Sequence, residues 1–218
     1  MSQNRSTAVM QRRGEAPDAL DFFPTPPWAT RALCEHLSQS LNLTRQDVWE
    51  PACGEGHMAR PLAEYFRDVY ASDVHDYGSA EQHDRCDFAI GWDWPEAVTS
   101  QEFHWIITNP PFRLASEFIW KAFGTARTGV AMLVRSAFLE GGGRYRDIFE
   151  PTPPFEILQF CERVPMLKGR LDRKAASATA YCWLVWRVDQ PVTAPAFRWL
   201  PPCRKRLERD SDYVEAPA

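Results

Sequence analysis

Short apolar runs alternate with segments of helical periodicity along most of this chain, and that alternation limits the fold more than any other feature. Runs typical of strands occupy residues 47–51, 69–73, 103–108 and 129–134. Apolar residues at helical spacing occur at residues 28–41, 57–67 and 114–126. Strands that alternate with helices build βαβ units, so we expect an α/β fold with a doubly wound, mostly parallel sheet.

The second half of the chain departs from this alternation. The apolar runs at 155–160 and 179–188 are joined by a basic loop without helical periodicity, which predicts an antiparallel C-terminal hairpin at the end of the sheet. The polar stretch 74–102 predicts only a short strand and a weak helix. We expect three parts, which are a mobile tail at 1–18, one domain at 19–189 and a proline-rich tail at 190–218.

Composition removes several classes of protein. A hydrophobic content of 44% and a charged content of 25% are ordinary for a globular chain and exclude wholesale disorder. The longest aliphatic run, VAMLV at 130–134, is too short to span a bilayer, and residues 1–15 lack the apolar core of a signal peptide. The six cysteines form no CxxC pair, so we expect no metal site, reduced thiols and a cytoplasmic protein.

The formal net charge of −4 hides a polarised chain. Residues 14–134 carry 8 basic and 18 acidic side chains, whereas residues 135–209 carry 14 basic and 8 acidic ones. Asymmetry of this kind is suited to a nucleic-acid partner. A solvated surface with chance clustering of charge is the alternative.

A glycine-containing turn joins the first expected strand to the next helix. Residues 52–56 read ACGEG, and glycines at such a turn let a ligand approach the backbone beside a helix N-terminus. Asp73 ends the following strand, nineteen residues after Gly54. An acid at about this distance holds the ribose hydroxyls in dinucleotide-type sites. The alternative is an ordinary strand-to-helix turn.

The strand at 103–108 ends abruptly in Asn109, Pro110, Pro111 and Phe112. Two prolines stop the strand ladder, so Asn109 is expected at the carboxyl edge of the sheet, where open α/β folds bind ligands. The Asn109 side-chain oxygen and the Pro110 carbonyl can accept both hydrogens of one planar amino group, and Phe112 can stack on the ring that carries it. A plain turn is the alternative.

EPACGEG at 50–56 followed by NPPF at 109–112 resembles the class I S-adenosylmethionine-dependent methyltransferases, specifically the DNA adenine-N6 methyltransferases. The resemblance covers about residues 21–188 and includes DFFPTPP at 21–27, similar to the segment that precedes the first helix in that family. It implies a Rossmann-like fold and S-adenosylmethionine as cofactor. The cofactor residues that it implies are Thr25, Pro26, Glu50, Ala52, Cys53, Gly54, Gly56, Asp73, Asp87 and Phe88.

The resemblance also assigns roles. Glu50 and the 52–56 turn would hold the methionine part of the cofactor, with Thr25 and Pro26 near its carboxylate. Asp73 would bind the ribose, and Asp87 with Phe88 would bind the adenine ring. The resemblance implies catalysis by Asn109, Pro110, Pro111 and Phe112, which would hold the target amine.

One departure from the family concerns sequence recognition. Only about 30 residues follow residue 188, well below the roughly 100 residues of a typical domain. The loop between the last two strands is therefore expected to contact nucleic acid, DNA in preference to RNA, through Arg163, Lys168, Arg170, Arg173 and Lys174. Phosphate contacts position but do not specify, so we expect short or relaxed specificity or a separate specificity partner. A solvated hairpin tip is the alternative.

Other functions stay open at this point. An RNA adenine-N6 methyltransferase shares NPPF, and a protein-glutamine methyltransferase uses a related motif whose usual tyrosine is Phe112 here. A cytosine-N4 enzyme more often has serine at the position of Asn109. A non-catalytic module that binds the cofactor is the alternative from another class, and the intact Asn109, Gly54, Gly56 and Asp73 argue against it.

Overall fold

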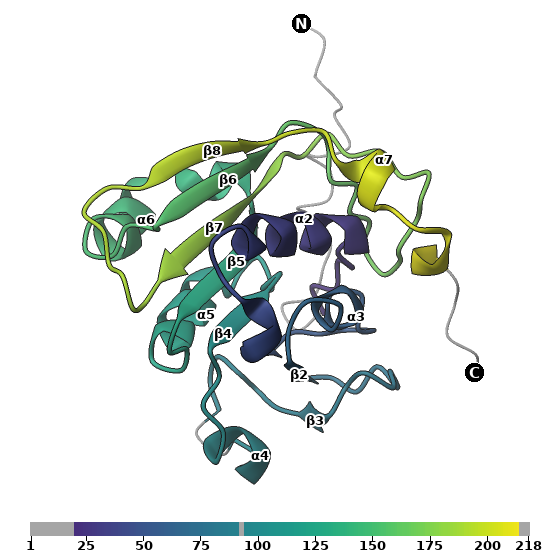
Figure 1. Cartoon of the computed structure of the whole chain (residues 1–218), viewed down its shortest axis with the longest axis horizontal. Coiled ribbons are helices and arrows are strands. Elements are labelled where there is room, and N and C mark those ends of the chain that lie inside the picture. The colour runs from purple at the N-terminus through teal and green to yellow at the C-terminus, as the bar shows by residue number, and fades with distance from the viewer. Residues whose placement is uncertain (1–19, 92–93, 214–218) are drawn as a thin grey trace, which may run out of the picture.

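An eight-stranded mixed sheet forms the centre of the computed structural model, which describes residues 20–91 and 94–213. The strand order is β3-β2-β1-β4-β5-β7-β6-β8 (Figure 1). Neighbouring strands are parallel except at β7, which is antiparallel to both β5 and β6. The strands are β1 Asp47–Glu50, β2 Asp68–Asp73, β3 Asp84–Arg85, β4 Trp105–Thr108, β5 Gly129–Arg135, β6 Glu156–Phe160, β7 Tyr181–Arg187 and β8 Ala196–Leu200. The predicted doubly wound α/β sheet with an antiparallel C-terminal hairpin is thereby confirmed.

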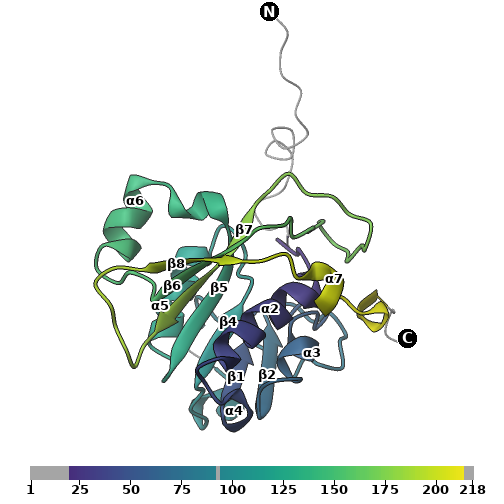
Figure 2. The ribbon, with the colours of Figure 1, turned by 45° about the horizontal axis from the view of Figure 1, so that its top comes forward.

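Helices cover both faces of the sheet. Alternate side chains of a strand point to opposite faces, so Trp105 and Trp183 pack with Leu33 of α2 on one face. Ile106 packs with Phe118 of α5 on the other. Helices α2, α3 and α7 lie together on the first face (Figure 2). The helices are α2 Pro27–Ser38, α3 Ala59–Leu62, α4 Glu96–Thr99, α5 Ala115–Phe123, α6 Gly142–Arg144 and α7 Arg204–Leu207, with 3₁₀ turns at η1 Leu43–Arg45, η2 Ser136–Leu139 and η4 Asp210–Tyr213 and a π turn at η3 Tyr145–Phe149.

Helix α3 is shorter than the periodicity of residues 57–67 predicts. Pro61 has no N–H to donate to the carbonyl of His57, so one bond is missing from the helical ladder, which continues from Leu62 N–H to the Met58 carbonyl at 3.0 Å. The chain then closes with tighter bonds, from Glu64 N–H to the Pro61 carbonyl at 3.3 Å and from Tyr65 N–H to the Leu62 carbonyl at 3.0 Å. The spacing of apolar residues, on which the predicted helix rests, does not reveal that Pro61 lacks a backbone N–H.

The chain after residue 189 differs from the predicted tail. Strand β8 pairs in parallel with β6 along its whole length and so enlarges the sheet beyond the hairpin. The buried guanidinium of Arg31 on α2 then fixes the following segment. It donates to the Leu207 carbonyl at 2.9 Å and to both carboxylate oxygens of Asp212 at 2.8 Å. Up to Tyr213 this segment is therefore packed against the sheet and α2. The predicted tail at 1–18 lies outside the described residues.

The reversed direction of β7 places one loop at the site. Strand β6 runs parallel to β4 and β5 and ends at the same carboxyl edge, where β7 begins. The loop 161–180 between them therefore starts and ends at that edge.

Candidate active site

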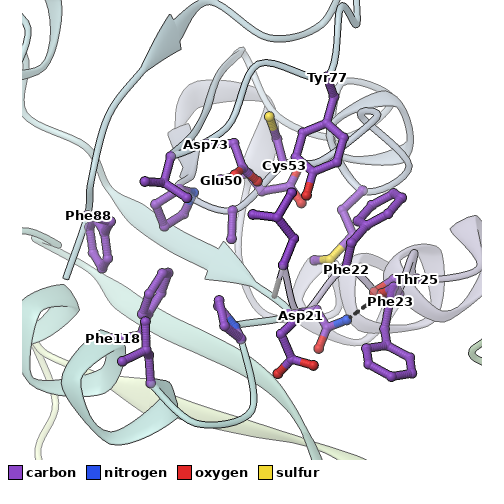
Figure 3. Close-up of a pocket in the computed structure, with 18 of the residues that line it drawn as sticks. Asp21, Phe22, Phe23, Thr25, Glu50, Cys53, Asp73, Tyr77, Phe88 and Phe118 are labelled. Carbon is purple, nitrogen blue, oxygen red and sulfur yellow. Dashed lines mark hydrogen bonds between the residues drawn. The ribbon is translucent and has the colours of Figure 1, made fainter. Parts of the chain in front are cut away.

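A cavity of about 870 Å³ opens at the carboxyl ends of β1, β2 and β4. The sheet order reverses between β1 and β4, and open α/β sheets bind ligands in the crevice at such a point. Figure 3 shows Glu50, Asp73 and Tyr77 on one side of the cavity and Phe88 with Phe118 on another. Of the predicted site residues, the cavity is lined by Thr25, Glu50, Ala52, Cys53, Asp73, Asp87, Phe88, Asn109 and Pro111.

The glycine turn is shaped by two residues with positive φ. Gly54 has φ 53° and Gly56 has φ 78°, values that side-chain-bearing residues rarely adopt. A Cβ on Gly54 would lie 2.4 Å from the ring of Phe22, so the N-terminal segment closes directly on this turn. Both glycines lie behind the lining, which Ala52 and Cys53 form in their place.

Two carboxyl groups lie deep in the cavity. Oδ2 of Asp73 accepts the Gly54 backbone N–H at 2.9 Å, and Oδ1 accepts that of His75 at 3.1 Å. Burial raises the pKa of Asp73, and the two backbone donors oppose that rise. Burial raises the pKa of Glu50 well above its ordinary value, and the neighbouring charge of Asp73 raises it further. The site therefore favours a cationic ligand, which would restore the charged form of Glu50.

Unpaired polar atoms gather in this cavity. Among the described residues, six buried side-chain atoms have no hydrogen-bond partner. Three of them, Thr25 Oγ1, Glu50 Oε2 and Asn109 Oδ1, belong to residues that line the cavity. Buried polar groups are nearly always paired, so these acceptors are suited to a ligand with several hydrogen-bond donors.

The orientation of Asn109 is fixed by its neighbours. Its Nδ2 donates to the carbonyl of Phe23 at 3.0 Å and lies 3.7 Å from Sδ of Met166. Its two donor hydrogens thus face protein acceptors, and Oδ1 is left as an acceptor for a ligand. Pro110, the next residue, is buried outside the cavity lining.

Phe112 lies beside the cavity and is not part of its lining. Its ring contacts that of Phe23 with centroids 5.1 Å apart, and the guanidinium of Arg135 lies 3.8 Å from its centroid. Its backbone N–H donates to Asp21 at 2.7 Å. The Arg135 guanidinium thus covers one face of the ring through a cation–π contact.

The predicted residues for an adenine ring occupy the far part of the cavity. Oδ1 of Asp87 accepts the Ile90 backbone N–H at 2.9 Å, which orients its carboxylate. Phe88 is buried between Trp49 and Phe118, and its ring centroid lies 5.0 Å from the centroid of each of those rings. Pro26 does not reach the cavity, because its carbonyl starts α2 by accepting the Ala29 N–H at 2.9 Å.

The five predicted cations of the 161–180 loop are all exposed. The loop reaches the site through Met166 beside Asn109 and through Gly169, whose N–H donates to the Phe22 carbonyl at 2.9 Å. Arg173 contacts Asp210 at 2.5 Å and Glu208 at 3.6 Å, and Arg170 contacts Asp172 at 3.6 Å.

Sequence reasoning did not single out several residues of the site. Asp21, Phe22, Tyr77 and Met166 all contact it, yet none stands in a distinctive motif. The DFFPTPP stretch contained the signal for the first two, because its prolines exclude regular structure. Within 20–91 and 94–213, no group of three or more His, Cys, Asp or Glu could hold a metal ion, and no helix is long and apolar enough to cross a membrane.

The sequence matches no protein-family model and no curated protein. Solved structures do resemble it. A type I restriction-modification methyltransferase subunit from Streptococcus thermophilus aligns with a TM-score of 0.61 at 11% identity, over 87% of this chain and 51% of that one. A candidate RNA methyltransferase from Pyrococcus horikoshii aligns with a TM-score of 0.57 at 13% identity, over 82% of this chain and 95% of that one.

Magnesium protoporphyrin IX methyltransferase from Synechocystis PCC 6803, with bound S-adenosylmethionine, aligns at 0.50 and 16% identity, over 84% of this chain and 91% of that one. The present chain spans about half the length of the S. thermophilus subunit and of a type I modification subunit from Vibrio vulnificus YJ016. The chain has the fold of the class I S-adenosylmethionine-dependent methyltransferases.

Proposed function

We propose that this chain is an S-adenosylmethionine-dependent methyltransferase that acts on the N6 amino group of adenine in DNA. The buried Oδ1 of Asn109 carries this proposal, because it has no partner in a cavity where the same side chain's Nδ2 is already bound to the Phe23 carbonyl. An acceptor held in this way is suited to an amino group that donates two hydrogen bonds.

The polar groups that line the cavity fit the cofactor. The unpaired oxygens of Thr25 and Glu50 and the carboxylate of Asp73 are acceptors, and the cofactor presents an ammonium group, a sulfonium and ribose hydroxyls as cations or donors. When bound, S-adenosylmethionine supplies an electrophilic methyl group. Glu50 and the 52–56 turn would hold its methionine part, Asp73 its ribose and Asp87 with Phe88 its adenine.

The chain's own residues then act by positioning. A conjugated exocyclic amine is a weak nucleophile, and acceptance of its two hydrogens by Asn109 Oδ1 and the Pro110 carbonyl favours a pyramidal nitrogen. These acceptors would aim the nitrogen lone pair at the electrophilic methyl group that the bound cofactor supplies. The amino nitrogen would give up a proton only after it has become cationic, so no strong base is needed. Orientation and electrostatics account for most of the acceleration.

The nucleic acid would approach at the same edge of the sheet. A target adenine in a duplex must leave the base stack to reach Asn109, and Phe112 is placed beside that position. The cations of the 161–180 loop support phosphate contacts. The described residues form one sheet with its helices and no separate recognition domain, so we propose short specificity or a separate specificity partner.

RNA is the second candidate substrate. Adenine in RNA carries the same amino group, and the likeness to the candidate RNA methyltransferase spans nearly all of that chain. The Asn109 geometry does not depend on the sugar. A protein-glutamine amide remains a third substrate that the same acceptors would hold, and cofactor binding without catalysis is the non-enzymatic alternative.

The deciding experiment uses methyl-labelled S-adenosylmethionine with separate pools of DNA, RNA and protein. We expect label in DNA, and mass spectrometry of the nucleosides should identify N6-methyladenine. Label confined to RNA or to protein would replace DNA as the substrate. Cofactor binding without label in any pool would contradict the enzymatic proposal.

A further inference from the structure

Two aromatic side chains are exposed on the edge strand of the sheet. Phe197 is 53% exposed and Trp199 is 64% exposed, and their ring centroids lie 5.0 Å apart. The two residues are separated by one position on β8, so both side chains point to the same face. Large apolar groups gathered on a surface in this way mark an interaction site.

Trp199 of this aromatic pair lies near the carboxyl end of β8, and therefore near the carboxyl edge of the sheet, where the proposed active site opens. Trp199 is the register partner of Gln159 on β6, and Gln159 Oε1 accepts a hydrogen bond from Ser136 Oγ at 2.8 Å. Ser136 directly follows Arg135, whose guanidinium covers the ring of Phe112. Phe112 and Arg135 lie on the face of the sheet that α2 covers, whereas Gln159 and Trp199 lie on the other face, so a strand that contacts both groups must pass over the carboxyl edge. Three strand spacings separate β5 from β8, which corresponds to about 14 Å.

The surface is hollowed beside the aromatic pair. A groove of about 740 Å³ is lined by Phe197 and Trp199 together with Ser136, Gln159 and the exposed Arg163. The acid in this groove, Glu162, is already bound to the backbone amides of Cys203 and Arg204. The groove therefore offers aromatic rings beside a cation, the combination that single-stranded nucleic acids use for base stacking and phosphate contact.

The edge strand is poorly suited to pairing with a second copy of this chain. Pro195 and Pro201 stand directly before and after β8 and cannot donate to a continued ladder. Between them, Arg198 places a charge on the strand and donates to Glu156 at 2.5 Å. Charged residues and flanking prolines are features that keep natural sheet edges from pairing.

We propose that Phe197 and Trp199, with Arg163, form a stacking site for nucleotides that flank the target base in a single or locally opened nucleic-acid strand. This inference rests on the proposed function. A base that leaves its stack deprives its neighbours of a stacking partner, and the aromatic pair replaces that partner.

The test measures binding of a fluorescein-labelled, 20-nucleotide single-stranded DNA by anisotropy. We expect the double variant F197A/W199A to raise Kd by about 10- to 100-fold, since stacking contributes about 1–3 kcal/mol per base. The dependence of Kd on salt should keep its slope, because no phosphate contact is removed. Both side chains are exposed, so the fold should tolerate their loss.

Two variants serve as controls. W120A removes another exposed tryptophan, 45% exposed on α5, and should leave Kd unchanged. W199F keeps an aromatic face and should retain most of the binding. The matched RNA oligonucleotide should show the same ratio of variant to wild-type Kd, because stacking does not read the 2′-hydroxyl.

Other outcomes would overturn the inference. An unchanged Kd of F197A/W199A on both 20-mers, with methyl transfer to nucleic acid present in the wild type, removes the stacking site and leaves the proposed function. A change in oligomeric state of the double variant in light scattering assigns the aromatic pair to an interface between copies. Absence of methyl transfer to any nucleic acid by the wild type removes the proposed function itself.

Discussion

The backbone N–H of Gly54 donates a hydrogen bond to Oδ2 of Asp73 at 2.9 Å. This bond joins the turn after β1 to the last residue of β2, so the two parts of the first sequence motif hold each other. Because Oδ1 of Asp73 is also bound, by the His75 amide, the carboxylate is fixed in orientation before any ligand arrives. A site held in place by its own backbone spends little ordering entropy on binding.

Replacement of Asp73 by alanine should weaken cofactor binding. The variant D73A loses charged hydrogen bonds worth about 1.5–3 kcal/mol each, so we expect Kd for S-adenosylmethionine to rise about 10- to 100-fold in calorimetry. D68A, at the exposed start of the same strand, is the matched control and should bind normally. Equal affinities of D73A and wild type would refute the proposed ribose contact.

Replacement of Asn109 by alanine should abolish methyl transfer and spare cofactor binding. Loss of one positioned acceptor typically costs about 100- to 1,000-fold in rate. Transfer of labelled methyl groups measures the rate, and calorimetry should show a cofactor Kd within about twofold of the wild type. N42A, an exposed asparagine at the start of η1, controls for the substitution. Activity retained in N109A would exclude its amine-holding role.

Replacement of Glu50 by glutamine should stabilise the ligand-free protein, increasingly so as pH rises. The unfolded glutamate titrates near about 4.3, whereas burial raises the pKa of Glu50 in the folded protein. The stability that its proton provides is complete below the unfolded pKa and is lost as pH rises through the folded pKa. We therefore expect the Tm of E50Q to exceed that of the wild type by a margin that widens between pH 5 and pH 8.

The same variant should bind the cofactor less tightly. A cationic ligand draws Glu50 towards its charged form, so wild-type binding should release protons, detected by calorimetry in buffers of different ionisation enthalpy. E50Q should release fewer protons. E117Q, exposed on α5, removes one charge without these effects. A Tm margin that narrows with rising pH would contradict the assignment.

Removal of cations from the 161–180 loop should weaken nucleic-acid binding and flatten its salt dependence. Each phosphate contact contributes about −0.9 to the slope of log K against log salt on duplex DNA. The triple glutamine variant of Lys168, Arg170 and Lys174 should lose up to about three such contributions. R173Q alone should lose less, because Asp210 and Glu208 already compete for its guanidinium.

A matched control for this loop lies on the opposite edge of the sheet. Arg45, Arg67 and Arg127 are exposed and stand just before or at the amino ends of β1, β2 and β5. Their triple glutamine variant removes the same charge and should leave the salt slope unchanged. Equal salt slopes for the two triple variants would show that the 161–180 loop makes no phosphate contacts and is a solvated hairpin tip.

The sheet up to β7 could be predicted because its strands are buried and short. Runs such as Trp105–Thr108 are buried throughout, and helices between them leave a parallel arrangement as the simple solution. Strand β8 could not be predicted in this way. Four of its five residues, Ala196 to Trp199, are exposed, so burial leaves no clear alternation in the sequence. Its pairing with β6 is a tertiary effect.

The site was predictable where a motif forces the backbone. Gly54 and Asn109 stand at strand ends whose neighbours exclude a continued ladder, and both lie at the carboxyl edge. Asp21 and Met166 were not predictable, because their contacts with Phe112 and Asn109 join segments far apart in the chain.

The reversal of β7 has a consequence for how such a chain can diversify. Since the 161–180 loop leaves and re-enters the sheet at one edge, its length and composition can vary while β6 and β7 keep their register. The cofactor cavity is built from β1, β2 and β4, on the other side of β5 in the strand order. Exchange of this loop between chains of the same fold, with Met166 and Gly169 kept, should thus transfer the proposed substrate preference and leave the proposed cofactor cavity intact.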